Sequence, residues 1–221
     1  MEYHATILMT EFVTHDVKRF VITRPDGFTF HPGQGVELSI DDPRWLDIKR
    51  PFTPTSLPDD EVLEFTIKGY PEHKGMTVQL HQLSAGAKLL MSEPFGTIQY
   101  KGPGTFIAAG AGITPFLAII RRLARDNQLG NHSLLFSNKG PADIICEQEL
   151  SHYLGEAATF ICTRTSDCRC QHLRIDRDFL QQYVSDIKQH FYVCGPPPFV
   201  GAINSALQDL GANPDALIFE R

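Results

Sequence analysis

The sequence predicts a β-rich domain followed by an α/β domain built on a doubly wound parallel sheet. Residues 1–101 contain many short β-rich runs separated by turn residues, which is typical of a sandwich or a closed barrel. From residue 105 onward, short apolar runs alternate with helical patterns, which indicates βαβ units with helices on both faces of a sheet. Gly-Pro-Gly at 102–104 separates the two patterns, so we expect domains at 1–101 and 102–221.

In the first half, turn chemistry such as Pro25-Asp-Gly27 and Pro58-Asp-Asp60 marks the ends of the strands. One short helix is expected at 77–83, because Val78, Leu80 and Leu83 are spaced for a single face. The expected strands are 4–12, 17–23, 28–30, 36–40, 50–56, 62–68, 88–92 and 97–100.

In the second half, short apolar runs have the length of buried parallel strands, and each is followed by a helical pattern. The expected strands are 105–109, 133–137, 159–163, 191–194 and 216–219, with helices starting near Thr114, Asp143, Asp178 and Pro197.

The segment 105–123 has the pattern of a strand, a glycine turn and a helix. Gly110 and Gly112 bracket the turn, Thr114 is expected as the N-cap, and Pro115 as the first helical residue. A helix start after a glycine turn presents free backbone N–H groups and a positive dipole end, which suit a phosphate. An ordinary βα unit is the alternative interpretation of this segment alone.

Three suggestive segments follow predicted parallel strands: Gly110 to Pro115, Ser137 to Lys139, and Cys194 to Pro198. Ligands of open parallel sheets bind at the carboxyl ends of the strands. Because the three segments share that edge, the sequence favours a dinucleotide site.

Composition excludes several classes of function. A net charge of −6 without a basic run does not fit a nucleic-acid binder. The N-terminus has no signal-peptide pattern, and no apolar run is long enough to span a membrane, so a cytoplasmic protein is expected. The five cysteines are expected to be reduced thiols. Cys168-Arg-Cys170-Gln-His172 could ligate a metal, but it lacks a second ligand pair, so a surface loop and no metal site are expected.

Residues 50–56, Arg-Pro-Phe-Thr-Pro-Thr-Ser, place an arginine, an aromatic ring and three hydroxyl groups on an extended segment. On a strand, Arg50 and Phe52 share a face and Thr53 lies on the other. An arginine can donate two parallel hydrogen bonds to a phosphate, and a phenyl ring can cover a flat heterocycle. A proline-rich edge strand is the alternative interpretation.

The motifs, in order, resemble those of the ferredoxin–NADP reductase superfamily over nearly the whole chain. Arg-Pro-Phe-Thr at 50–53 is similar to the family's Arg-x-Tyr-Ser/Thr signature, Gly110 to Pro115 to its nucleotide loop, and Cys194-Gly-Pro-Pro197 to its late motif. Glu93 stands where the family usually has the first glycine of Gly-Pro-x-Gly. The resemblance implies an antiparallel, flavin-binding β-barrel at 1–101 and an NAD(P)-binding domain at 102–221.

The resemblance also implies roles on the flavin side. Arg50 would meet a flavin phosphate, Phe52 would pack on the isoalloxazine, and Thr53 would approach flavin N5. Two phosphate-binding elements suit FAD better than FMN. The flavin-contacting residues implied are Arg50, Pro51, Phe52, Thr53, Ile67, Lys68, Tyr70, Gly75, Met76 and Thr77, with Phe219 or Glu220 covering the other flavin face.

On the nucleotide side, Thr114 and Cys194 would lie beside the nicotinamide, and with Thr53 they are the residues assigned to catalysis. Lys139 and Arg164 would hold the 2′-phosphate of NADPH, with NADH possible. The nucleotide-contacting residues implied are Gly110, Gly112, Ile113, Thr114, Pro115, Lys139, Arg164, Cys194, Gly195 and Pro196.

The resemblance implies an FAD-dependent oxidoreductase that takes hydride from NAD(P)H and passes electrons to a separate carrier, ferredoxin or flavodoxin. The chain lacks the cysteine spacing of a plant-type iron–sulfur domain, so a separate acceptor is expected. The alternatives are a subunit of a multicomponent oxygenase or dehydrogenase, a reductase of ferric chelates or free flavin, and a sensing module without turnover. No nucleic acid or membrane is expected as a partner.

Overall fold

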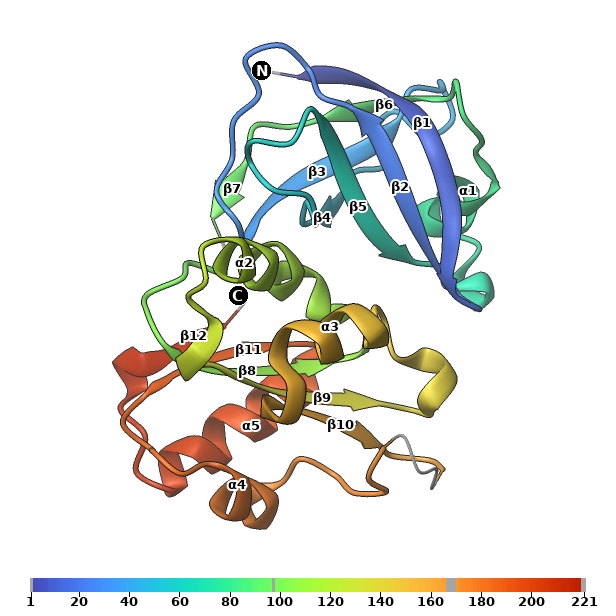
Figure 1. Ribbon diagram of the computed structural model, residues 1–221. Helices are drawn as coiled ribbons and strands as arrows, with labels where there is room; N and C mark the ends of the chain where they lie inside the picture. The colour runs from blue at the N-terminus through green and yellow to red at the C-terminus, as the bar shows by residue number, and fades with distance from the viewer. Residues whose placement is uncertain (1, 97, 166–169, 220–221) are drawn as a thin grey trace.

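The computed structural model describes residues 2–96, 98–165 and 170–219 and shows two domains, as predicted (Figure 1). An antiparallel sheet forms the N-terminal domain and a parallel sheet forms the C-terminal domain. Helix α2 (Thr114–Arg125) lies between them. The boundary at residues 101 and 102 stays a prediction. No helix in the described ranges is both long and apolar enough to cross a membrane.

The N-terminal strands pair in the order β4-β3-β6-β1-β2-β5, with β7 beside β3. The ring closes where the chain after β4 returns to β5: Pro54 bridges Phe65, and the Thr55 N–H donates to the Glu64 carbonyl at 2.7 Å. The sheet is therefore a barrel. Its strands are β1 Tyr3–Thr14, β2 Val17–Thr23, β3 Gln34–Ile40, β4 Arg50–Phe52, β5 Val62–Lys68, β6 Lys88–Met91 and β7 Phe95–Gly96, and its helix is α1 Met76–Gln82.

Three predicted barrel strands differ in the structure. Phe28 and Phe30 are buried in the barrel core, but the segment 28–30 is irregular. The strand expected at 50–56 ends at Phe52, because Pro54 has no N–H to continue the ladder. Of the strand expected at 97–100, Thr97 lies outside the described residues and 98–100 are irregular.

The C-terminal strands are all parallel and pair in the order β10-β9-β8-β11-β12. The chain therefore starts at the centre with β8, winds outward through β9 and β10, and returns to the other side of β8 with β11. The switch in winding direction lies between β8 and β11. The strands are β8 Gly104–Ala109, β9 Ser133–Asn138, β10 Ala158–Cys162, β11 His190–Cys194 and β12 Leu217–Phe219.

Alternating side chains of the parallel strands supply two apolar layers. Phe106 and Ala108 of β8 pack with α2 and with α3 (Glu147–Leu154) on the face toward the barrel. Ile107, between them, packs with α4 (Arg177–Tyr183) and α5 (Pro197–Asp209) on the opposite face. A strand buried on both faces is apolar at most positions, which is why β8 lacks a polar alternation.

The helix starts differ from the prediction in two places. The expectation that Thr114 is an N-cap is wrong. Residues Gly110–Ile113 form a 3-10 turn that runs directly into α2, so Thr114 already has helical φ and ψ of −60° and −39°. Its hydroxyl donates to the Ala111 carbonyl at 3.0 Å instead of capping an N–H. The helix expected near Asp143 begins at Glu147, after a separate turn at Pro141–Asp143.

The expectation that all five cysteines are reduced is wrong for Cys162 and Cys170, which form a disulfide. Residue 171 returns alongside β10: the Cys162 N–H donates to the Gln171 carbonyl at 2.8 Å. This return brings the two Cα atoms to 5.7 Å, within disulfide reach. Cys170 is 9% exposed and so is not a surface residue, whereas Cys168 lies outside the described residues.

One arginine of α2 ties the domains together. The Arg121 guanidinium pairs with Glu64 of β5 at 2.6 Å and donates to the Thr55 carbonyl at 2.6 Å, so it contacts the barrel twice. It also donates two bonds, at 2.6 and 2.9 Å, to Glu149 of α3. Burial alone would lower the pKa of Arg121, but the two carboxylates outweigh it and raise the pKa above its usual range. Arg121 therefore remains charged.

Candidate functional site

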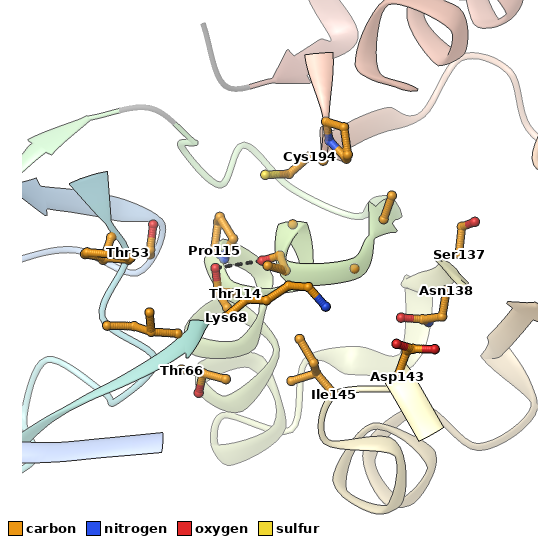
Figure 2. A pocket seen from close by; sticks show the side chains of 18 of the residues that line it. Thr53, Thr66, Lys68, Thr114, Pro115, Ser137, Asn138, Asp143, Ile145 and Cys194 are labelled. Atoms are coloured by element: carbon orange, nitrogen blue, oxygen red, sulfur yellow. Dashed lines mark hydrogen bonds between the residues drawn. The ribbon is translucent and has the colours of Figure 1, made fainter. Parts of the chain in front are cut away.

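A cleft of about 740 Å³ lies between the barrel and the carboxyl edge of the parallel sheet, and both domains line it. Figure 2 shows Thr53 on the barrel side and Ser137 and Asn138 at the far end, with the start of α2 between them. The predicted residues that line it are Pro51, Phe52, Thr53, Ile67, Lys68, Tyr70, Thr77, Gly110, Gly112, Thr114, Pro115, Lys139, Cys194, Gly195 and Pro196.

The barrel wall of the cleft combines rings with hydroxyl groups. Phe52 and Phe95 line it together with Thr53, whose side chain is 8% exposed. Gly35 of β3 lies against this wall, and a Cβ at that position would lie 3.3 Å from the Phe95 ring. Rings beside hydroxyl groups can cover a flat heterocycle and hydrogen-bond its edge.

Lys68, at the end of β5, forms an ion pair at this wall of the cleft. Its ammonium hydrogen-bonds to Asp16 in the turn between β1 and β2. Burial alone would raise the pKa of Asp16, but the hydrogen bond and charge of Lys68 outweigh it, so the pKa is lowered. Asp16 is thus ionised at neutral pH and keeps the Lys68 side chain in place.

Glycines let the turn after β8 approach the turn after β11. Gly110 has φ of +53°, the left-handed region that favours glycine. A Cβ on Gly112 would lie 2.4 Å from the Cys194 carbonyl oxygen and 2.7 Å from Gly195 Cα. The two strand ends can therefore meet only if residue 112 has no side chain. This close approach lies at the switch point of the sheet, where ligands of such sheets bind.

The two predicted residues on the nucleotide side enter the cleft from these turns. Thr114 begins α2, but its N–H donates to the Ala111 carbonyl and Pro115 has no N–H. The N–H groups without an intrahelical acceptor therefore lie in the preceding turn, which starts at Gly110. Cys194 ends β11, is 4% exposed, and lies across the cleft from the threonine (Figure 2). A dinucleotide pyrophosphate would meet both backbone N–H groups and the positive end of the helix here.

The far end of the cleft lies at the ends of β9 and β10. Lys139 and Thr163 line it, and the Arg164 N–H donates to the Lys139 carbonyl at 3.0 Å, which brings the backbones of the two basic residues together. Asp143 also lines this end, and its Oδ2 accepts from the Gly140 N–H at 2.9 Å.

Some predicted residues lie outside the lining. Arg50 is exposed and donates to the Lys49 carbonyl at 2.8 Å. Met76 and Ile113 are buried in the apolar cores, and neither Gly75 nor Arg164 lines the cleft. Glu220 lies outside the described residues.

Sequence reasoning missed several lining residues. Thr66 precedes Lys68 by two positions on β5, so the period of a strand could have placed it on the same face. Asn138 and Ser137 stood in a segment that the sequence singled out, but only Lys139 was assigned a role. No sequence signal marks Asp143 or Ile145, because a turn of irregular geometry carries them into the cleft.

Comparison with known proteins identifies this arrangement. Residues 4–100 match the model of the oxidoreductase FAD-binding domain, and residues 106–205 match that of the oxidoreductase NAD-binding domain. The chain belongs to the ferredoxin–NADP reductase superfamily. It is therefore placed among NAD(P)H-dependent flavoprotein reductases that bind FAD, as the sequence predicted.

Individual members of the superfamily are distant relatives. The ferredoxin–NAD(P)⁺ reductase component of the naphthalene 1,2-dioxygenase system of Pseudomonas putida is 24% identical, over 95% of this chain and 66% of its own. NADH-cytochrome b5 reductase 2 of Rattus norvegicus is 29% identical, over 98% of this chain and 93% of its own. The chain thus spans about two thirds of the first relative and nearly all of the second.

A solved structure shows the same fold. The ferredoxin NADP⁺ reductase of Neisseria gonorrhoeae, which has bound FAD and NADP, superposes with a TM-score of 0.82 at 20% identity. The match covers 99% of this chain and 98% of that one. At this identity the likeness establishes the fold of this reductase and not its acceptor.

The residues that line the cleft fit both cofactors of the superfamily, FAD and a nicotinamide nucleotide. The turn at Gly110–Ile113 presents backbone N–H groups that suit a pyrophosphate, and the barrel wall supplies rings and hydroxyl groups. The cleft spans both domains, which is what a flavin and a nucleotide in contact require.

Proposed function

We propose that this reductase takes hydride from NADPH through bound FAD and passes the electrons to a separate small redox protein, ferredoxin or flavodoxin. The observation that carries the proposal is the single cleft that Thr53 enters from the barrel and Thr114 and Cys194 enter from the α/β domain. Bound FAD would supply the chemistry, since a flavin accepts a hydride and releases single electrons.

The chain's own residues would bind the flavin and the nicotinamide nucleotide and orient them. The turn at Gly110–Gly112 would hold the pyrophosphate with backbone N–H groups. Thr114 and Cys194 hold the nicotinamide from the sheet side, and Thr53 hydrogen-bonds the flavin edge from the barrel side.

On the flavin side, Arg50 binds one phosphate and the start of α1, at Gly75 to Thr77, binds the second. The Arg50 side chain contacts only a backbone carbonyl among the described residues, so its remaining N–H groups are available. Thr77 lines the cleft next to the barrel wall. Two phosphate sites support FAD over FMN.

NADPH is proposed as the preferred donor because Lys139 lines the far end of the cleft and the backbone of Arg164 is hydrogen-bonded to that of Lys139. We expect Arg164→Ala to lower kcat/KM for NADPH about tenfold and to leave kcat/KM for NADH nearly unchanged, since only NADPH carries the extra phosphate. Steady-state kinetics with both donors measures this. Equal values for NADPH and NADH in the wild-type protein would contradict the assignment.

The kind of acceptor is supported by the relatives. Their names describe a reductase component of a dioxygenase system and a cytochrome b5 reductase, and both names imply protein acceptors. A second candidate is therefore a reductase subunit that serves one oxygenase partner.

A panel of acceptors tests the proposal. FAD-loaded protein is mixed with NADPH and with ferredoxin, flavodoxin, ferric citrate or free flavin, and an artificial dye serves as the control for turnover. We expect the dye and at least one carrier protein to be reduced. Reduction of the dye and of small molecules alone would contradict a carrier-protein acceptor, and no turnover with the dye would contradict the reductase function.

A further inference from the structure

An unused hydrogen-bond acceptor lies in the cleft at the end of β9. Asn138 lines the cleft and is 5% exposed. Its Nδ2 donates weakly to the Phe136 carbonyl at 3.4 Å, and its Oδ1 has no donor within the described part of the chain. Figure 2 shows this side chain directed into the cleft. Buried carboxamide oxygens almost always accept a hydrogen bond, so this one requires a donor from outside the chain.

The backbone of Asn138 is fixed. Its carbonyl accepts from the Thr163 N–H at 2.9 Å and from the Thr163 hydroxyl at 3.2 Å. Only the terminal torsion of the side chain, which is soft, is left to adjust. The carboxamide oxygen can therefore turn toward a donor in the cleft without any movement of β9.

The sheet order shows which part of a dinucleotide would reach this oxygen. β11 lies on one side of β8 and carries Cys194, toward which the nicotinamide extends. β9 lies on the other side of β8, so it would meet the opposite, adenosine half of the dinucleotide. Ala109 pairs with Ser137, which places Asn138 level with the glycine turn at Gly110. The group next to the pyrophosphate in that half is the ribose of the adenosine.

Beside Lys139, which would hold a phosphate, this end of the cleft carries groups that suit ribose hydroxyls. Ser137 and Thr163 present hydroxyl groups at this end of the cleft, and Asp143 presents a carboxylate. All three side chains can accept hydrogen bonds from ribose hydroxyls, and the carboxylate of Asp143 can only accept.

We propose that the Asn138 carboxamide oxygen accepts a hydrogen bond from a ribose hydroxyl in the adenosine half of the nucleotide. The assignment rests on the proposed use of a nicotinamide nucleotide in this cleft. It makes Asn138 a binding residue that distinguishes a ribose from a deoxyribose.

Calorimetric titration of the FAD-loaded protein with ADP, 2′-deoxy-ADP and 3′-deoxy-ADP tests this without any turnover. The wild-type protein should bind ADP about tenfold more tightly than at least one deoxy analogue, because that analogue leaves the oxygen unpaired. Asn138→Ala should bind ADP about tenfold more weakly and lose the preference. A preference that survives in Asn138→Ala would overturn the proposal, and so would a wild-type protein that binds all three equally or not at all.

Asn204→Ala is the matched control. Its Oδ1 on α5 is also buried without a partner among the described residues, but the residue does not line the cleft. The preference for ADP should persist in this variant, and its loss there would overturn the specific assignment. A protein that binds the ribose hydroxyl but oxidises neither NADPH nor NADH would contradict the proposed function and leave the Asn138 contact standing.

Discussion

Replacing Gly112 by alanine is expected to lower kcat/KM for NADPH about 100-fold while the protein keeps its flavin. The added Cβ would lie 2.4 Å from the Cys194 carbonyl oxygen and 2.5 Å from the Cys194 carbonyl carbon. These are backbone atoms, so the clash cannot be relieved by a side-chain rotation. The turns after β8 and β11 must separate, and both Thr114 and Cys194 shift with them. Steady-state kinetics measures the loss, and the visible absorbance of the purified variant reports bound flavin.

Gly201→Ala is the control for this substitution. Gly201 lies in α5, and a Cβ there would meet nothing within 4 Å. We expect its kinetics to match the wild type. A Gly112→Ala variant with wild-type kcat/KM would show that the close approach of the two turns does not position the nucleotide.

Replacing Arg121 by methionine is expected to destabilise the protein by about 3 kcal/mol, because Glu64 and Glu149 lose the cation that they share. Glu64 then keeps only its longer contact with Arg19, at 3.6 Å. Glu64 and Arg121 have side chains that are only 14% and 15% exposed, and Glu149 loses a two-bond contact as well. The barrel and α2 also lose the bond to the Thr55 carbonyl. Urea denaturation followed by circular dichroism measures the change in unfolding free energy.

Arg122→Met provides the comparison on the same helix. Arg122 is exposed and pairs with Asp126 and Asp59 at the surface, where solvent screens ion pairs. The unfolding free energy of the Arg122→Met variant should differ little from that of the wild-type protein. If both variants lost equal stability, charge removal in general and not the buried contact between the domains would account for the effect.

Much of this fold could be predicted from the sequence because periodicity reports burial directly. β8 is apolar at nearly every position since both of its faces are covered. β5 alternates apolar Leu63, Phe65 and Ile67 with polar residues, since one of its faces packs in the barrel core. The need for glycine at 112 was also predictable, because a glycine in the turn just before a helix start indicates a place where a side chain would not fit. The motif at 50–53 indicated the flavin side, although only its last three residues line the cleft.

Other features depend on contacts between distant residues, which periodicity does not encode. The Cys162–Cys170 disulfide follows from the return of residue 171 alongside β10. The Arg121 contacts join positions 55, 64 and 149. Asn138 is notable only because its side-chain oxygen has no partner among the described residues, and the sequence cannot show that.

Anaerobic mixing of the FAD-loaded protein with NADPH tests most directly whether the two cofactors meet in this cleft. We predict that the visible flavin absorbance disappears as NADPH is oxidised in equal amount, in a rapid phase that Gly112→Ala slows. A protein that binds FAD and NADPH but keeps its flavin absorbance would contradict this mechanism, because the two rings would then not lie in contact between Thr53 and Cys194.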